Sequence, residues 1–164
     1  MSDYREKSIE MLNRAVTDEL TAVHQYMYFH FRLEDAGYQP LAQLFHRISI
    51  VEMRHVETLA ERILFLKGDV DMRVSHSTKK IHDVDKMLEY ALELETGSVA
   101  EYNEFAKACG ANGDSASKKL FEGLVVVEEE HQDIFDTELE NLRQFGDKYL
   151  ALQSHEHSKA VAEK

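Results

Sequence analysis

Four stretches of this 164-residue chain carry apolar residues at the alternating four- and three-residue spacing of a buried helix face. They cover roughly residues 4–35, 41–66, 83–109 and 115–145, so each is far longer than the average globular helix. The chain contains one Pro and seven Gly, so few residues interrupt these patterns. The sequence therefore predicts an all-α fold with four long helices.

The connections between these helices set their topology. Short turns join the first helix to the second and the third to the fourth, so each pair is expected to be antiparallel. The polar connection 69–82 is long enough to run the length of a helix, which starts the third helix parallel to the second. We predict an antiparallel four-helix bundle with one long crossover between helices 2 and 3.

The ends of the elements carry their own signals. Gly68 is expected to end the second helix, and Asp114 or Ser115 to cap the fourth. A short C-terminal helix is predicted over 147–153, which completes a bundle domain spanning residues 1–154. Residues 155–164 form a polar tail that we expect to be frayed.

Each helix interrupts its apolar stripe with polar residues at core positions. These are Glu19 on the first helix, Glu52 and His55 on the second, Glu95 on the third, and Glu128 and His131 on the fourth. An α-helix rises about 1.5 Å per residue, so counting residues from the shared ends of the bundle gives each glutamate a height along the bundle axis. The four heights are similar. The spacing also repeats, because 33 residues separate both Glu19 from Glu52 and Glu95 from Glu128. All six side chains can therefore meet in one layer of approximate twofold symmetry.

Such a layer needs positive charge. Four carboxylates cannot all stay ionised in an apolar core, whereas two divalent cations would neutralise them. Carboxylate and imidazole donors without thiolates favour iron or manganese over an iron–sulfur cluster or structural zinc. Glu52 and Glu128 would bridge the two metals, and Glu19 and Glu95 would be terminal ligands. A metal-free interaction module would need these side chains on the surface, which their helical phase contradicts.

A second stripe follows another side of the first two helices. It contains Leu20, His24, Met27 and Phe31 on the first, and His46, Ile50 and Met53 on the second. A helix that is apolar on two sides has two burial partners, which indicates a subunit interface.

Charge and composition exclude several classes of function. A net charge of −12 argues against nucleic-acid binding, which needs a basic face. The charged N-terminus and the lack of an 18-residue apolar run argue against a signal peptide and a membrane span. The lone Cys109 fits a reducing compartment, so we expect a cytoplasmic protein.

The chain resembles the bacterioferritins, the haem-containing members of the ferritin-like di-iron carboxylate proteins. The resemblance covers nearly the whole chain, including "VEMRHVETLAERILFLKG" and "VVVEEEHQDIFDTELENLRQFGDKYLALQ", and all six predicted ligand positions match. It implies a ferroxidase that oxidises Fe(II) with O2 or H2O2 and stores Fe(III) mineral inside a hollow 24-subunit shell. It further implies an electron-donor partner for iron release.

The resemblance also implies a haem shared between two subunits, with Met53 of each as the axial ligand. From the residues alone, Met53 reads as interface packing, and His24 and His46 on the same stripes are rival haem ligands because imidazole binds haem iron more commonly. Tyr26 matches a tyrosine that can supply an electron during iron oxidation.

Some positions depart from the family or leave other readings open. Arg47 and Val51 stand where certain bacterioferritins hold an additional iron through His and Asp, so we expect no such inner-surface site. His155 and His157 in the tail are possible metal ligands, although solvated tail residues are the better expectation. The alternative function is a rubrerythrin-like di-iron oxygenase or peroxidase, which would need a substrate pocket that the sequence does not announce.

Overall fold

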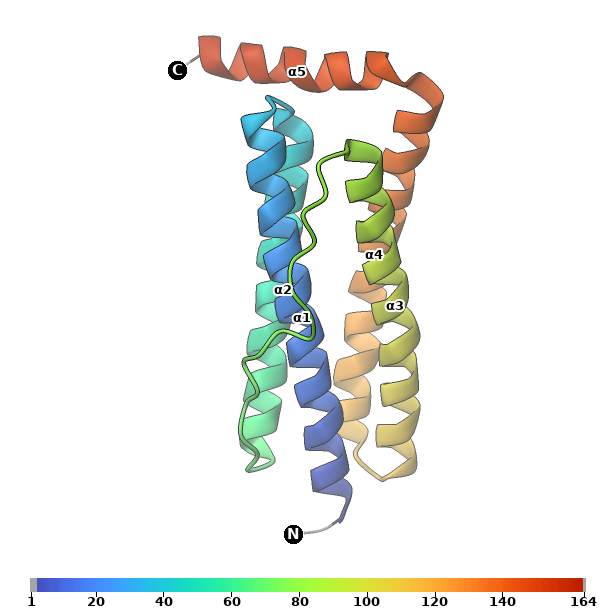
Figure 1. The fold of residues 1–164 in the computed structure, drawn as a ribbon. Coiled ribbons are helices and arrows are strands. Elements are labelled where there is room, and N and C mark those ends of the chain that lie inside the picture. The colour runs from blue at the N-terminus through green and yellow to red at the C-terminus, as the bar shows by residue number, and fades with distance from the viewer. Residues whose placement is uncertain (1–2, 164) are drawn as a thin grey trace.

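The structure, a computed structural model, describes residues 3–163, apart from the side chains of Asp3, His157 and Ala160. The described residues form five helices and no strand: α1 Asp3–Asp35, α2 Gln39–Phe65, α3 Val84–Ala111, α4 Ser115–Phe145 and α5 Asp147–Ala162 (Figure 1). The first four helices lie side by side, and α5 lies across one end of them. The predicted all-α four-helix bundle with a short C-terminal helix is confirmed.

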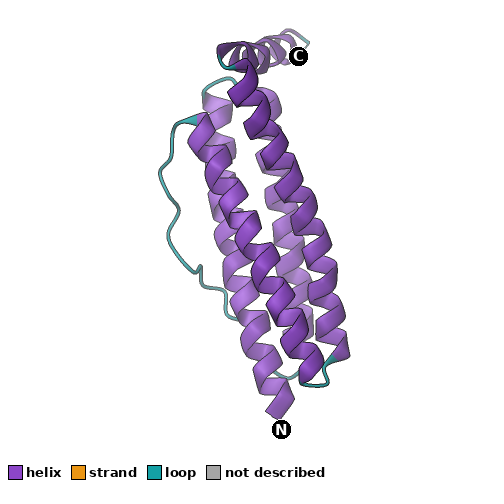
Figure 2. Cartoon of the chain, turned by 90° about the vertical axis from the view of Figure 1, so that its right-hand side faces the viewer, coloured by secondary structure: helices purple, strands orange, loops and turns teal. Residues whose placement is uncertain are grey.

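The bundle consists of two antiparallel hairpins, α1 with α2 and α3 with α4. Between them, the crossover 66–83 returns along the outside of the bundle from the end of α2 to the opposite end (Figure 2). Helix α3 therefore runs parallel to α2 and antiparallel to α1, as the length of the connection predicted.

The crossover is held against α1 by hydrogen bonds from its backbone to polar side chains of that helix. Asn13 Oδ1, Thr21 Oγ1 and Gln25 Oε1 lie 2.7, 2.9 and 2.8 Å from the amide nitrogens of Asp71, Ser75 and Lys79. These bonds satisfy backbone groups of a segment that has no regular structure of its own.

Both predicted helix ends lie near the expected residues. The side chain of Asp114 caps α4 by accepting from Ser117 N at 3.0 Å, as predicted. At the end of α2, however, the residue in the left-handed conformation is Lys67 (φ 69°) and not Gly68. Gly68 is required for space, because a Cβ there would lie 2.8 Å from Ile9 Cγ2.

Helix α5 is longer than expected, since it continues through residues 155–162. The expectation that this tail is frayed is therefore wrong for the described part. The first half of α5 is fastened to the bundle: Gln153 Oε1 accepts from Leu41 N at 2.9 Å, and Tyr149 donates to Glu138 at 2.5 Å. The described side chains of residues 155–162 are exposed, so no apolar stripe marks this extension in the sequence.

The apolar core is divided into two clusters along the bundle. One, nearer α5, includes Phe29, Phe45 and Phe135, and the other, nearer the opposite end, includes Leu12 and Phe121. The predicted polar layer lies between them, so apolar packing encloses it from both ends of the bundle.

Candidate metal centre

The structure brings all six predicted site residues together. Their exposed fractions are all below a tenth, for Glu19, Glu52, His55, Glu95, Glu128 and His131. They form two overlapping quartets of possible ligand atoms that lie within 4.8 Å of one another. Both quartets contain Glu52 and Glu128, and each adds one further glutamate and one histidine.

The first quartet gathers around the ring of His55. Its Nδ1 atom lies 2.9 Å from Glu52 Oε2, 3.0 Å from Glu128 Oε1 and 3.5 Å from Glu19 Oε2. One oxygen of each of three carboxylates therefore faces a single imidazole nitrogen.

The second quartet repeats this arrangement around His131. Its Nδ1 atom lies 2.9 Å from Glu52 Oε1, 3.4 Å from Glu128 Oε2 and 3.7 Å from Glu95 Oε2. Glu52 and Glu128 thus each turn one oxygen toward one histidine and the other oxygen toward the second. This is the orientation that a bridging carboxylate needs.

The layer contains buried polar atoms without hydrogen bonds. Within the described residues, both carboxylate oxygens of Glu52, Glu128 Oε1 and the Nδ1 atoms of His55 and His131 make no hydrogen bond of standard geometry. Buried polar atoms are normally paired, so a cluster of unpaired ones needs an explanation. Lone pairs that converge on a shared space fit a pair of cations, and carboxylate with imidazole is a donor set that iron accepts.

The electrostatics of the layer also favour cations. Burial and the charges of Glu128 and Glu52 raise the pKa of Glu19 well above its usual range. Burial and the charge of Glu52 do the same for the pKa of Glu95. Without metal, these two side chains therefore favour the neutral acid.

The histidines respond in the opposite direction. Burial alone would lower the pKa of His55 and of His131, but the surrounding carboxylates raise both pKa values to about 12. Burial opposes ionisation of Glu128, yet the His131 and His55 rings beside it hold its pKa below the usual range. Protons thus occupy the layer when metal does not, and metal binding must displace them.

Two buried tyrosines contact the outer oxygens of the layer. Tyr26 donates a hydrogen bond to Glu95 Oε1, and Tyr102 donates to Glu19 Oε1 at 2.5 Å. From the sequence, a role is predicted for Tyr26 only. The signal for Tyr102 was present, because it follows Glu95 by the same seven residues that separate Tyr26 from Glu19.

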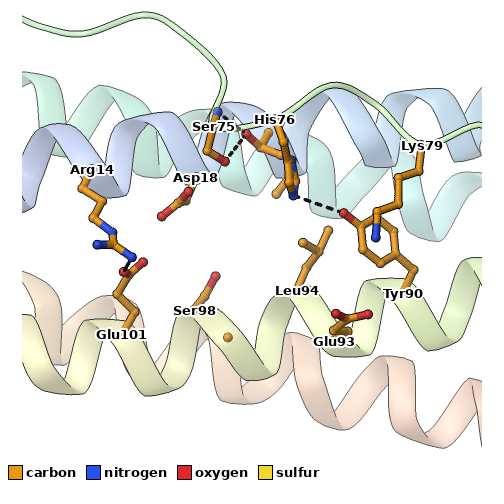
Figure 3. A pocket seen from close by; sticks show the side chains of 13 residues that line it. Arg14, Asp18, Ser75, His76, Lys79, Tyr90, Glu93, Leu94, Ser98 and Glu101 are labelled. Carbon is orange, nitrogen blue, oxygen red and sulfur yellow. Dashed lines mark hydrogen bonds and ion pairs between the residues drawn. The ribbon is translucent and has the colours of Figure 1, made fainter.

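A cavity of about 550 Å³ lies beside the layer, between α1, α3 and the crossover (Figure 3). Its lining includes Asp18 and Leu94, the chain neighbours of Glu19 and Glu95. Arg14 forms an ion pair with Glu101 at 2.5 Å on its rim. Burial and Asp18, opposed by Arg14, raise the pKa of Glu101 to about 7. The sequence did not predict this cavity, because the crossover that forms one wall has no periodicity.

The second stripe is partly exposed on the single chain. Phe31 and Ile50 are 58% and 42% exposed, and Met53 is half-buried. Leu20, which we placed on this stripe, is instead buried in the core at 5% exposure. The remaining side chains form a surface that a second subunit can cover, and the role of Met53 stays a prediction.

Other positions singled out in the sequence lie away from this layer or carry no common iron ligand. Arg47 is exposed and Val51 half-buried, and the expected lack of an inner-surface iron site there stays a prediction. His155 is exposed and outside the two quartets, while the His157 side chain lies outside what the structure describes. Over residues 3–163, no helix has an apolar stretch of the length that a bilayer requires.

Comparison with known proteins places these features in a family. Residues 9–145 match the family described as ferritin-like domain. The chain is 35% identical to a bacterioferritin of Desulfovibrio desulfuricans, in a match that covers 91% of this chain and 83% of that protein. It is 38% identical to a bacterioferritin of Brucella melitensis, in a match that covers 87% of this chain and 88% of that protein. A crystal structure of the D. desulfuricans bacterioferritin, described as showing its di-iron site in different catalytic states, has a TM-score of 0.91. That structure shares 34% identity and covers 93% of this chain and 89% of its own.

Proposed function

The chain belongs to the bacterioferritins, within the ferritin-like family, and on that premise we propose that its six buried carboxylate and imidazole side chains hold two irons. Its function is iron storage and detoxification, in which a di-iron ferroxidase centre oxidises Fe(II) to Fe(III) for deposition inside a protein shell. The observation that carries the proposal is the pair of quartets joined through Glu52 and Glu128.

Each protein group has a defined task in this centre. Glu52 and Glu128 offer one oxygen to each half, while Glu19 with His55 and Glu95 with His131 complete the halves separately. When bound, two irons held together supply electrons jointly to one oxidant molecule. The apolar clusters at either end of the layer limit access of water, and the histidine Nδ1 atoms give up their protons when they become ligands.

The storage function is tested by loading the protein with iron. Aerobic addition of Fe(II) well beyond two ions per chain should give Fe(III) that elutes with the protein in size-exclusion chromatography. Iron that stays at two per chain, with the excess precipitating in bulk, would contradict storage and favour an oxygenase. The cavity beside the layer does not suit an apolar organic substrate, because Arg14, Asp18, Glu93 and Glu101 give it a charged lining.

The oligomer and the haem form the second part of the proposal. The partly exposed stripe with Phe31 and Ile50 supports an interface between two copies of the chain. We propose dimers with haem held by Met53 from each subunit, assembled into a 24-subunit shell of about 24 times the 19.0 kDa chain mass. A protein that elutes as a monomer or an isolated dimer would contradict the shell. A cytoplasmic location remains part of the proposal, supported by the single free cysteine, Cys109.

A further inference from the structure

Two tyrosines connect the halves of the metal centre in a crossed pattern. Tyr26 and Tyr102 each lie seven residues after the glutamate of their own helix, yet each donates to the glutamate of the other helix. Seven residues are about two turns, so the backbone of each tyrosine lies about 10 Å along the helix axis from the glutamate of its own helix.

The antiparallel direction of α1 and α3 explains the crossing. Helical side chains lean toward the N-terminus of their helix, so residues on antiparallel helices lean in opposite directions. Tyr26 leans back along α1 toward the layer, and Glu95 leans along α3 toward Tyr26. Tyr102 and Glu19 meet in the same way on the other side of the layer.

Each hydrogen bond leaves one carboxylate oxygen directed inward. In Glu19, Oε1 accepts from Tyr102 while Oε2 lies 3.5 Å from the Nδ1 atom of His55. In Glu95, Oε1 accepts from Tyr26 while Oε2 lies 3.7 Å from the Nδ1 atom of the other histidine. The division between an outer and an inner oxygen is therefore the same in both halves.

The rings that carry these hydroxyls are fixed by packing. Both tyrosines are fully buried. Tyr102 packs against Phe105 and Phe121, with ring centroids 6.3 and 5.8 Å apart. A hydroxyl on a fixed ring can hold a carboxylate in one orientation. A mobile donor would move together with the carboxylate and would not fix its orientation.

We propose that Tyr102 is a positioning residue for the Glu19–His55 half of the centre, as Tyr26 is for the Glu95–His131 half. Each helical hairpin thus orients the terminal ligand of the other, so neither half of the centre is complete in one hairpin. The inference rests on the proposed di-metal function of the six residues. It assigns Tyr102 to one metal position and not to the centre as a whole.

Anaerobic titration with Co(II), followed by its visible d–d absorption, tests this assignment without any oxidation step. We expect wild type to bind two ions per chain, and Tyr102→Phe to bind one of them about 10- to 100-fold more weakly with an altered spectrum. Tyr90→Phe is the matched control, because it removes a buried tyrosine hydroxyl of α3 that contacts His76 outside the layer. Its titration should match wild type.

A Glu19→Ala background decides which position each tyrosine serves. It disables the Glu19–His55 half, so adding Tyr102→Phe should change nothing, whereas adding Tyr26→Phe should weaken the remaining ion about 10- to 100-fold. A Glu95→Ala background should give the reverse result. Should Tyr102→Phe fail to fold, Tyr26→Phe still tests the crossed arrangement, because it should weaken the remaining ion in Glu19→Ala and change nothing in Glu95→Ala. Melting of the metal-free variants shows whether the fold is retained.

The outcomes separate this inference from the function on which it rests. Wild-type protein that binds fewer than two Co(II) ions would overturn the di-metal centre itself. Two ions in wild type, with unchanged affinities and spectrum in Tyr102→Phe, would overturn only the positioning role. Equal weakening by Tyr102→Phe in both alanine backgrounds would show a general structural effect and would also overturn it.

Discussion

Replacing Glu128 by Ala should disable iron oxidation while leaving the bundle folded. Glu128 belongs to both quartets, so each metal position would lose one of its four protein donors. Two divalent cations would then face three carboxylates, which leaves one positive charge in a buried site without a partner. Removing one partner of a buried charge pair costs about 3–5 kcal/mol, which corresponds to roughly 100- to 4000-fold in affinity at about 1.4 kcal/mol per factor of ten.

The fold should survive this change because the histidines can adjust. Without metal, the carboxylate of Glu128 is a principal group that raises the pKa of His55 and of His131. When it is removed, these pKa values fall and the imidazoles can become neutral, so no unpaired charge has to remain buried. Ala also has the highest helix propensity, so α4 should remain helical.

Stopped-flow absorbance after mixing with Fe(II) and O2 measures the effect. We expect the fast oxidation phase to disappear in Glu128→Ala and one Co(II) ion to be lost from the high-affinity range. Glu130→Ala is the matched control, since Glu130 is an exposed glutamate two residues further along α4. A normal fast phase in Glu128→Ala, or an equal loss in Glu130→Ala, would refute the assignment of Glu128 as a shared ligand.

Three further predictions follow from other parts of the structure. Metal affinity should rise with pH, and metal binding should release protons. The reason is that His55 and His131 have pKa values of about 12 without metal and must lose protons to become ligands. An affinity that does not change with pH would contradict this. Gly68→Ala should lower the free energy of unfolding by about 1–3 kcal/mol through overpacking, whereas Gly123→Ala, with nothing within 4 Å of its added Cβ, should raise it by about 0.5–1 kcal/mol. Denaturant titration compares the two. Met53→Leu should abolish haem binding but keep the shell and rapid iron oxidation. An unchanged haem spectrum would favour His24 or His46 as the haem ligand in place of Met53.

The positions of the six polar core residues could be predicted because helix geometry is regular. Once the apolar stripe fixed the phase of each helix, counting residues from the bundle ends placed Glu19 and Glu52 at similar heights. The structure has them in one layer with the four other predicted residues. The long crossover followed from the same arithmetic, since connection 69–82 had to return along a helix.

Features held by single polar contacts were not predictable in this way. The crossover follows α1 because Asn13, Thr21 and Gln25 accept from its backbone, and no hydrophobic pattern encodes those bonds. The end of α2 was assigned to Gly68 by residue type, but the chain uses Lys67 for the left-handed position and needs Gly68 for close packing. Composition indicates where a turn lies, whereas packing decides which residue carries each constraint.

The charge balance of the polar layer explains how the fold can exist with or without metal. Without metal, Glu19 and Glu95 favour the neutral acid, and protonated His55 and His131 face the carboxylate of Glu128. With metal, four carboxylates, two neutral imidazoles and two divalent cations would carry no net charge. Protons and metal are therefore alternative ways to neutralise the same buried groups, and the apolar clusters at either end need not rearrange between them. We expect such a centre to release and rebind iron without unfolding, because the bundle already holds the six proposed ligands in place.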